Sequence, residues 1–229
     1  MFIDFHTHHD RQASQLLNLR SVHLTSKLQP SDLPPYCSLG LHPWFIEPLA
    51  WQRDMESLLE NLQLLAQLPQ VIAIGECGLD RQVNLPMSLQ LQIFQRQIIL
   101  AEQLRKPLVI HCVRAFSELI FLKKKLQKEG IGSVPWIIHG FHRKAEVFNQ
   151  MLDHDFYFSL GAAILNDRAF VSQAIATMPQ GRFLLETDDR QDITIEQIYT
   201  RAAHLRQVPI ATLQSQLIET YTQLTGRRI

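Results

Sequence analysis

The sequence predicts an α/β barrel of the TIM type, and two observations lead to this prediction. Eight short apolar runs, rich in β-branched and aromatic residues, recur along the 229 residues and have the length of buried strands. Most are followed by a polar loop and by a longer segment in which apolar residues recur every three or four positions, as on one face of a helix. Strands that alternate with helices pair in parallel, and eight of them close into a barrel with every carboxyl end on one side.

Each element can be placed on the sequence. The expected strands are Phe2–His6, Ser21–Leu24, Cys37–His42, Val71–Glu76, Leu108–His111, Trp136–His139, Tyr157–Leu160 and Phe183–Glu186. Residues 55–65 and 91–101 carry the helical spacing, and we expect their apolar faces to pack on the sheet. Residues 28–36 are rich in proline, so we expect no full helix between the second and third strands.

Charge, cysteine content and hydropathy exclude several classes of protein. Lys and Arg together number 22, as do Asp and Glu, so no overall field draws the chain to nucleic acid or to a membrane surface. Three cysteines do not make a disulfide framework, and no apolar stretch approaches the roughly 18 residues that span a bilayer. We expect one cytoplasmic domain over residues 1–229, with no membrane association and no obligate protein partner.

Side chains that bind metal ions stand at the carboxyl ends of the expected strands, where a barrel of this type carries its active site. His6 and His8 are two residues apart on one strand and therefore point the same way. The expected ligands are His6, His8, Glu76, His111, His139 and Asp188. We expect one or two divalent ions per chain with Glu76 as a bridge, and imidazole-rich coordination favours Zn²⁺, followed by Mn²⁺ and then Mg²⁺. We assign no function to His23, which lies outside this pattern.

Six segments of the sequence resemble, in their residues and their order, a known family. They are FIDFHTH, SLGLHPW, VIAIGECGLD, ILAEQLRKPLVIHC, WIIHGF and RFLLETDD. Over nearly the whole chain, the sequence resembles the TatD-type metal-dependent deoxyribonucleases of the amidohydrolase superfamily. The resemblance implies the same six metal ligands, and it implies that His42, in GLHPW, contacts the substrate.

The chain departs from this family around the substrate groove. His111 is followed by Cys-Val-Arg where the family has Ser-Arg-Asp, and His139 is followed by Gly-Phe-His-Arg without the family's Cys and Ser-Gly pair. After Asp188 the family has a proline-bearing loop, whereas here residues 189–192 lead almost directly into a helix expected to begin near Thr194. We therefore expect a shorter groove wall.

The expected activity is metal-dependent hydrolysis of phosphodiester bonds at DNA or RNA ends. Two divalent ions and two carboxylates leave about two positive charges, which suits a phosphate-containing substrate. Asp188 and Glu76 are the expected catalytic residues, with Asp188 taking the proton of the attacking water. His42, Arg114 and His142 are expected to bind phosphate oxygens. Two alternatives remain, namely a small-molecule amidohydrolase or phosphoesterase on the same metals, and a non-catalytic metal-binding protein.

Overall fold

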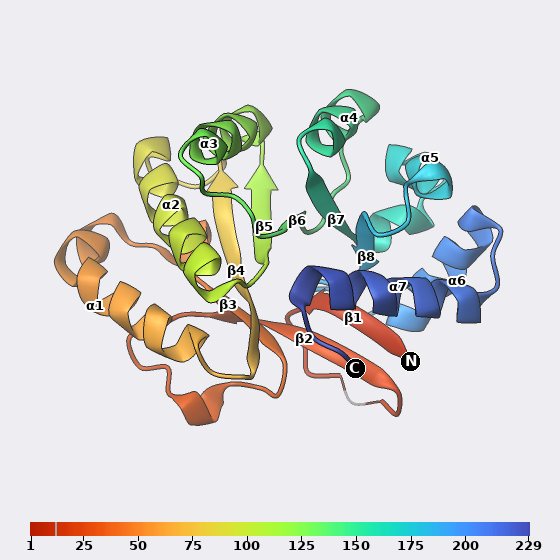
Figure 1. The fold of residues 1–229 in the computed structure, drawn as a ribbon, viewed down its shortest axis with the longest axis horizontal. Coiled ribbons are helices and arrows are strands. Elements are labelled where there is room, and N and C mark those ends of the chain that lie inside the picture. Colours follow the sequence, from red (N-terminus) through yellow and green to blue (C-terminus); the bar gives the residue numbers. More distant parts are fainter. Residues whose placement is uncertain (12) are drawn as a thin grey trace. The chain divides into compact units, whose positions relative to one another are not determined.

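The computed structural model describes residues 1–11 and 13–229, apart from the side chains of residues 48–53. Its strands are β1 (Phe2–Thr7), β2 (Leu16–His23), β3 (Cys37–Gly40), β4 (Val71–Asp80), β5 (Leu108–Val113), β6 (Trp136–Ile138), β7 (Phe156–Leu160) and β8 (Phe183–Leu185). They follow one another in chain order in an eight-stranded sheet (Figure 1). The eight strands and their order confirm the prediction from the apolar runs.

Helices occupy most connections between the strands. They are α1 (Pro48–Ala66), α2 (Met87–Leu104), α3 (Phe116–Lys128), α4 (Ala145–Asp153), α5 (Phe170–Thr177), α6 (Ile195–Arg206) and α7 (Ile210–Thr225). Between β2 and β3 the described residues form only the short 3-10 helix η1 (Pro30–Asp32), as the prolines predict. Among the described residues, no helix combines the length and hydropathy that a membrane span requires.

Strands β2 and β4 are each at least four residues longer than expected from the sequence, whereas the ends of the other strands differ from the expected ones by at most two residues. β2 begins at Leu16 rather than at residue 21, because Leu17 and Leu19 alternate with polar residues and are buried. β4 continues past Glu76 to Asp80, and every residue in it is buried. Glycine weakens a strand signal in a sequence, which is why the second half of β4 was missed.

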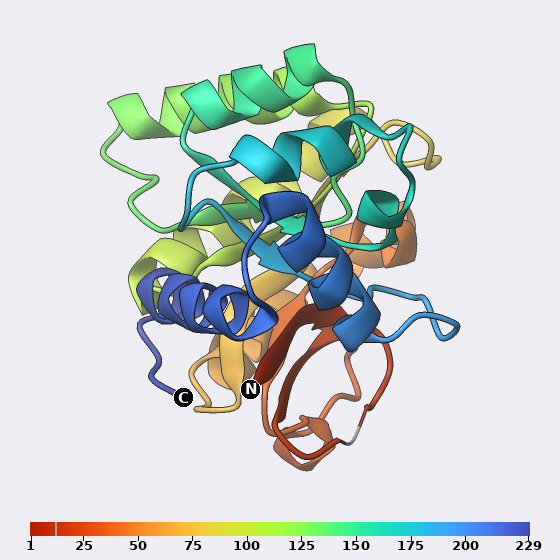
Figure 2. The same ribbon diagram turned by 90° about the vertical axis from the view of Figure 1, so that its right-hand side faces the viewer.

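Contacts divide the chain into two compact units, and the first consists of residues 1–20 and 137–229. In this unit β1 pairs with β2, and β7 pairs with β8, in parallel. A parallel bridge between Thr7 and Asp188 joins the ends of β1 and β8. Helices α6 and α7 cover β1, with Tyr199 donating its hydroxyl to the Ile3 carbonyl and Tyr221 packed edge-on against Phe5 (Figure 2).

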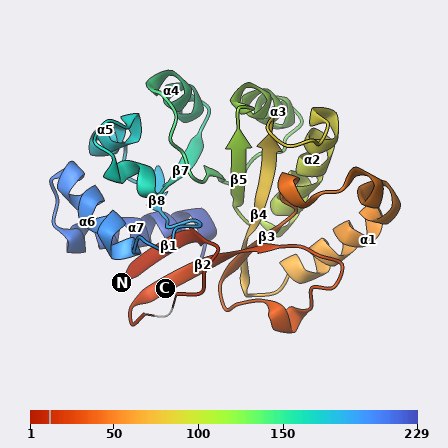
Figure 3. The same cartoon turned by 180° about the vertical axis from the view of Figure 1, so that it is seen from behind.

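The second unit consists of residues 21–136 and contains β3, β4 and β5 as parallel neighbours. Helix α2 packs on β4 and α3 on β5, and they lie beside these strands in Figures 1 and 3. The strands approach closely at Gly40, where a Cβ atom would lie 2.7 Å from the Gly75 Cα atom. The division into two units does not test the expectation of one domain over residues 1–229, which stays a prediction.

Candidate metal centre

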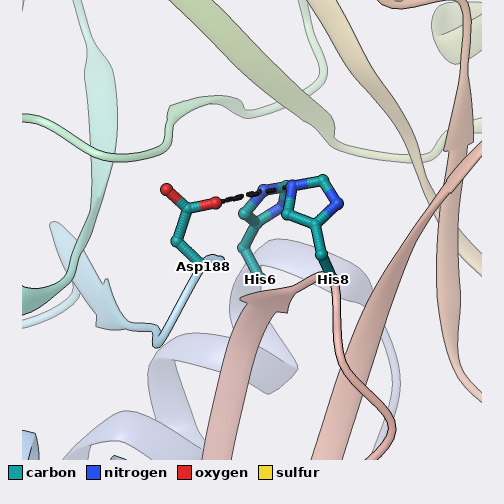
Figure 4. A group of neighbouring side chains, drawn as sticks. All are labelled: His6, His8 and Asp188. Atoms are coloured by element: carbon teal, nitrogen blue, oxygen red, sulfur yellow. Dashed lines mark ion pairs between the residues drawn. The ribbon is translucent and has the colours of Figure 1, made fainter. Parts of the chain in front are cut away.

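The first group of possible ligands lies in the first unit, where the ends of β1 and β8 meet. His6 is buried in β1, His8 is exposed just after it, and Asp188 follows β8 (Figure 4). Asp188 Oδ1 lies 3.6 Å from His6 Nε2 and 3.5 Å from His8 Nε2. Ligands bound at about 2.1 Å around a tetrahedral ion are about 3.4 Å apart, so this spacing fits a divalent cation.

Backbone hydrogen bonds hold these three side chains together. The Asp188 N–H donates to the His6 carbonyl at 2.9 Å, and the His8 N–H donates to the Asp188 carbonyl at 3.1 Å. Just before Asp188, Thr187 donates its backbone N–H and its hydroxyl to the buried Asp4 carboxyl at 2.8 and 2.6 Å. Burial raises the pKa of Asp4 to about 7, although these bonds oppose the rise. Asp4 therefore fastens the end of β8 to β1.

The imidazoles also set the charge of Asp188. Burial acts to raise the pKa of Asp188, but hydrogen bonds from His6 and His8 outweigh it and hold that pKa well below its usual range. The carboxyl group is consequently ionised at neutral pH. An ionised carboxylate oxygen between two imidazoles is a donor set suited to a metal of borderline softness.

His139 and Glu186 extend this group within the same unit. The His139 ring centroid lies 4.2 Å from that of His6, and His139 Nδ1 lies 3.8 Å from Glu186 Oε1. Ligand atoms of His139, Glu186 and Asp188 all fall within 4.8 Å of one another. The same Glu186 oxygen accepts the Gly140 N–H at 2.6 Å, so Glu186 also fixes the loop after His139.

A second group lies in the second unit and is formed by His42, Glu76 and His111. All three are buried, and their ligand atoms lie within 4.8 Å of one another. Glu76 Oε1 is 3.0 Å from His42 Nε2 and 3.0 Å from His111 Nδ1. Two of the expected ligands, Glu76 and His111, thus lie side by side, and His42 adjoins them.

Neighbouring hydrogen bonds distinguish the two imidazoles of this group. The Trp44 backbone N–H donates to His42 Nδ1 at 3.1 Å, so the proton of a neutral His42 is on Nε2 and points to Glu76. His111 Nε2 lies 2.9 Å from Asp80 Oδ2 and donates to it, which leaves Nδ1 as an acceptor facing Glu76. Two acceptors at 3.0 Å need a proton or a metal ion between them. The His111–Glu76 pair therefore suits a cation, whereas His42 suits the role of hydrogen-bond donor.

Asp80 is a site residue that was not predicted from the sequence. Asp80 is buried, and its Oδ2 accepts the Trp44 indole N–H at 2.6 Å as well as His111 Nε2. Burial acts to raise the pKa of Asp80, but the bonds from His111 and Trp44 keep it lowered. Strand alternation places Asp80 on the same side of β4 as Glu76, and the sequence would indicate this only if the strand were extended past Glu76.

The predicted phosphate contacts are placed as follows. His142 is exposed, its Nδ1 lies 2.7 Å from the Gly140 carbonyl, and it lines a cavity of about 200 Å³ with Asp188 and Arg190. Arg114 follows β5 and is exposed, three residues after His111. As expected, residues 189–192 lead directly into α6, whose N-cap is Thr194.

Comparison with known proteins identifies the family. A family model described as TatD related DNase matches residues 9–225. The chain belongs to this family. It is 31% identical over 160 residues to an uncharacterized metal-dependent hydrolase, YabD, of Bacillus subtilis, covering 67% of this chain and 58% of that protein. It is 27% identical over 175 residues to the 3'-5' ssDNA/RNA exonuclease TatD of Citrobacter koseri, covering 75% and 64% of the two chains. The chain thus spans about three fifths of the length of these relatives.

Solved structures of the family share the fold. The TatD homologue YJJV of Escherichia coli K12 matches with a TM-score of 0.71 and 23% identity, over 91% of this chain and 86% of that one. A TatD family hydrolase of Entamoeba histolytica matches with a TM-score of 0.72 and 16% identity, over 98% and 97%. These similarities confirm the α/β fold of the TIM-barrel class.

Proposed function

We propose that this chain is a metal-dependent hydrolase that cleaves phosphodiester bonds at the ends of single-stranded DNA or RNA. The observation that carries the proposal is the grouping of imidazole nitrogens and carboxylate oxygens within 4.8 Å, once around Asp188 and once around Glu76. The relative from Citrobacter koseri is named a 3'-5' ssDNA/RNA exonuclease, and this name supports the choice of substrate.

The proposed ligands are the six residues predicted from the sequence, which are His6, His8, Glu76, His111, His139 and Asp188. They would hold one or two divalent ions, with Zn²⁺ preferred because nitrogen ligands dominate the set. When bound, the ions supply Lewis acidity and lower the pKa of a coordinated water. The bridging role of Glu76 remains part of this proposal.

Residues of the chain supply the proton transfers and the substrate contacts. Asp188, which is ionised at neutral pH, accepts a hydrogen bond from the attacking water and takes its proton as the water oxygen bonds to phosphorus. The P–O bond to the leaving nucleoside oxygen breaks in the same step, and the proton held by Asp188 passes to that oxygen. His42 is the proposed substrate contact: its Nε2–H faces Glu76 Oε1 at 3.0 Å in this structure, and it would be free to donate to a phosphate oxygen if Glu76 held a metal ion instead. In the cavity beside Asp188, His142 and Arg190 offer further donors, and Arg114 offers another after β5.

Hydrolysis of an end-labelled single-stranded oligonucleotide tests this function. We expect Glu76→Gln and Asp188→Asn each to lower the rate at least about 100-fold, the scale of a lost acid–base or ligand group. Glu129→Gln, an exposed carboxylate at the end of α3, is the matched control and should leave the rate unchanged. A nitroanilide and a lactone, assayed in parallel, separate the alternatives. Turnover of these substrates without phosphodiester cleavage would replace the proposal with an amidohydrolase, and no turnover would favour a metal-binding protein.

A further inference from the structure

A second cavity lies in the second unit, beside the His42–Glu76–His111 group. It has a volume of about 250 Å³ and lies between the end of β2, the turn after β3 and the first half of α1. Leu24, Leu41 and Leu58 give it apolar walls, and Phe45 forms part of its rim. This volume is smaller than the roughly 300–1,000 Å³ of pockets for drug-sized ligands, so the cavity fits a single heterocycle.

His23 provides a polar atom in this apolar setting. Its ring centroid lies 4.6 Å from that of Phe45, and its Nδ1 is buried without a hydrogen-bond partner among the described residues. Burial lowers the pKa of His23 to about 4, and the nearby His42 adds to this, so the imidazole is neutral at physiological pH. A neutral imidazole in the lining of an apolar cavity suits contact with a neutral ligand rather than with a charged one.

The charge of the cavity excludes a phosphate group as its occupant. Glu47 and Asp54 are the ionisable lining residues besides His23, and the described lining includes no lysine or arginine. Carboxylates repel phosphate but accept hydrogen bonds from exocyclic amino groups. The chemistry therefore favours a flat, neutral ring with an amino substituent.

Phe45 connects this cavity with the proposed catalytic group. Its side chain is 59% exposed, and its ring centroid lies 5.6 Å from that of His42. An aromatic face next to a phosphate-binding imidazole is the arrangement that stacks one base of a single strand while its phosphate is held alongside.

We propose that this cavity binds one nucleobase next to the scissile phosphate, with the base stacked on Phe45 and lying against the His23 ring. The carboxylates of its wall favour the bases with an exocyclic amino group, namely adenine, cytosine and guanine, over thymine. This inference rests on the proposed function, since it names a subsite for the same nucleic-acid substrate.

Abasic substitution tests the subsite. Oligonucleotides that end in deoxyadenosine, in thymidine or in an abasic residue are compared as substrates, with the abasic position moved through the last three residues. For the wild type we expect kcat/KM to fall roughly 10- to 100-fold, mainly through KM, when one of these bases is removed. Phe45→Leu should show the same loss with the intact strand and little further loss with the abasic one. Phe121→Leu, a 70% exposed phenylalanine on α3, is the matched control.

A binding measurement without turnover separates failure of the subsite from failure of the proposed function. Deoxyadenosine, which has no phosphodiester bond to cleave, is titrated into the protein while the His23 ring is followed by NMR, and His23→Phe and Phe45→Leu serve as comparisons. Saturable shifts of His23 that Phe45→Leu weakens would support the subsite even if no oligonucleotide is cleaved. Absence of these shifts overturns it, as does cleavage that is indifferent to base removal and to Phe45→Leu.

Discussion

At the scale of single residues, hydrogen bonds decide which imidazole nitrogen faces the candidate metal centre. Asp80 accepts from His111 Nε2 at 2.9 Å and so turns the His111 Nδ1 lone pair toward Glu76. The Trp44 indole N–H donates to the same Asp80 oxygen at 2.6 Å and holds the carboxylate in place. A carboxylate behind a histidine ligand orients the ring and raises its basicity, so Asp80 is a positioning residue.

Asp80→Asn tests this positioning role. The amide is neutral and supports His111 less well, so we expect the affinity for Zn²⁺ to fall about 10- to 100-fold. Competition with a chromophoric chelator measures that affinity directly, without any substrate. Asp192→Asn removes an exposed carboxylate that pairs with Arg190 and should leave the affinity unchanged. Equal Zn²⁺ affinities of the wild type and Asp80→Asn would show that Asp80 does not position His111 and has only a packing role.

Some of these residues could be predicted from the sequence and others could not. The meeting of His6, His8 and Asp188 follows from strand alternation and from the adjacency of the first and last strands of a barrel. Asp80 follows from the same alternation once β4 is known to continue past Glu76. The bond from the Trp44 backbone to His42 depends on the short helix η2 (Pro43–Phe45), whose geometry the sequence pattern does not specify.

At the scale of elements, the spacing between β3 and β4 places Glu76 next to His42. Gly40 makes this spacing possible, since a Cβ atom there would lie 2.7 Å from Gly75 Cα and 2.9 Å from the Glu76 carbonyl oxygen. Both obstacles are backbone atoms, which cannot rotate away. Gly78, with a φ of +144°, plays a similar part between β4 and β5, where a side chain would meet the His111 carbonyl.

Gly40→Ala should therefore push β3 away from β4. We expect it to lower the free energy of unfolding by about 1–3 kcal/mol, the usual cost of overpacking, and to weaken Zn²⁺ binding. Denaturant unfolding measures the first effect and chelator competition the second. Gly130→Ala is the comparison, because a Cβ atom there meets nothing within 4 Å, so only its φ of +78° is strained. That variant should retain wild-type Zn²⁺ binding, and a Gly40→Ala protein with wild-type stability would contradict the argument.

At the scale of the whole molecule, the alternation of strands and helices was sufficient to predict the fold class. Periodicity identifies buried strands and amphipathic helices, and the rule for parallel connections then leaves few topologies. The ends of strands were harder to predict than their existence. Polar residues alternate with apolar ones at the start of β2, and glycines interrupt the second half of β4, so neither segment has the continuous apolar run that indicates a buried strand. The cavity lined by His23 and Phe45 could not be predicted from the sequence. Its walls come from β2, the turn after β3 and α1, and only tertiary packing brings these segments together.

The central claim is that the His and carboxylate groups bind divalent metal ions, and metal content tests it most directly. The protein is purified without chelators, dialysed, and analysed by inductively coupled plasma mass spectrometry alongside Asp188→Asn and Glu76→Gln. We expect one to two divalent ions per wild-type chain, chiefly zinc, and a lower content in each variant. Glu129→Gln should match the wild type. A wild-type chain with no divalent ion above the buffer level, even after dialysis against Zn²⁺ or Mn²⁺, would contradict the account.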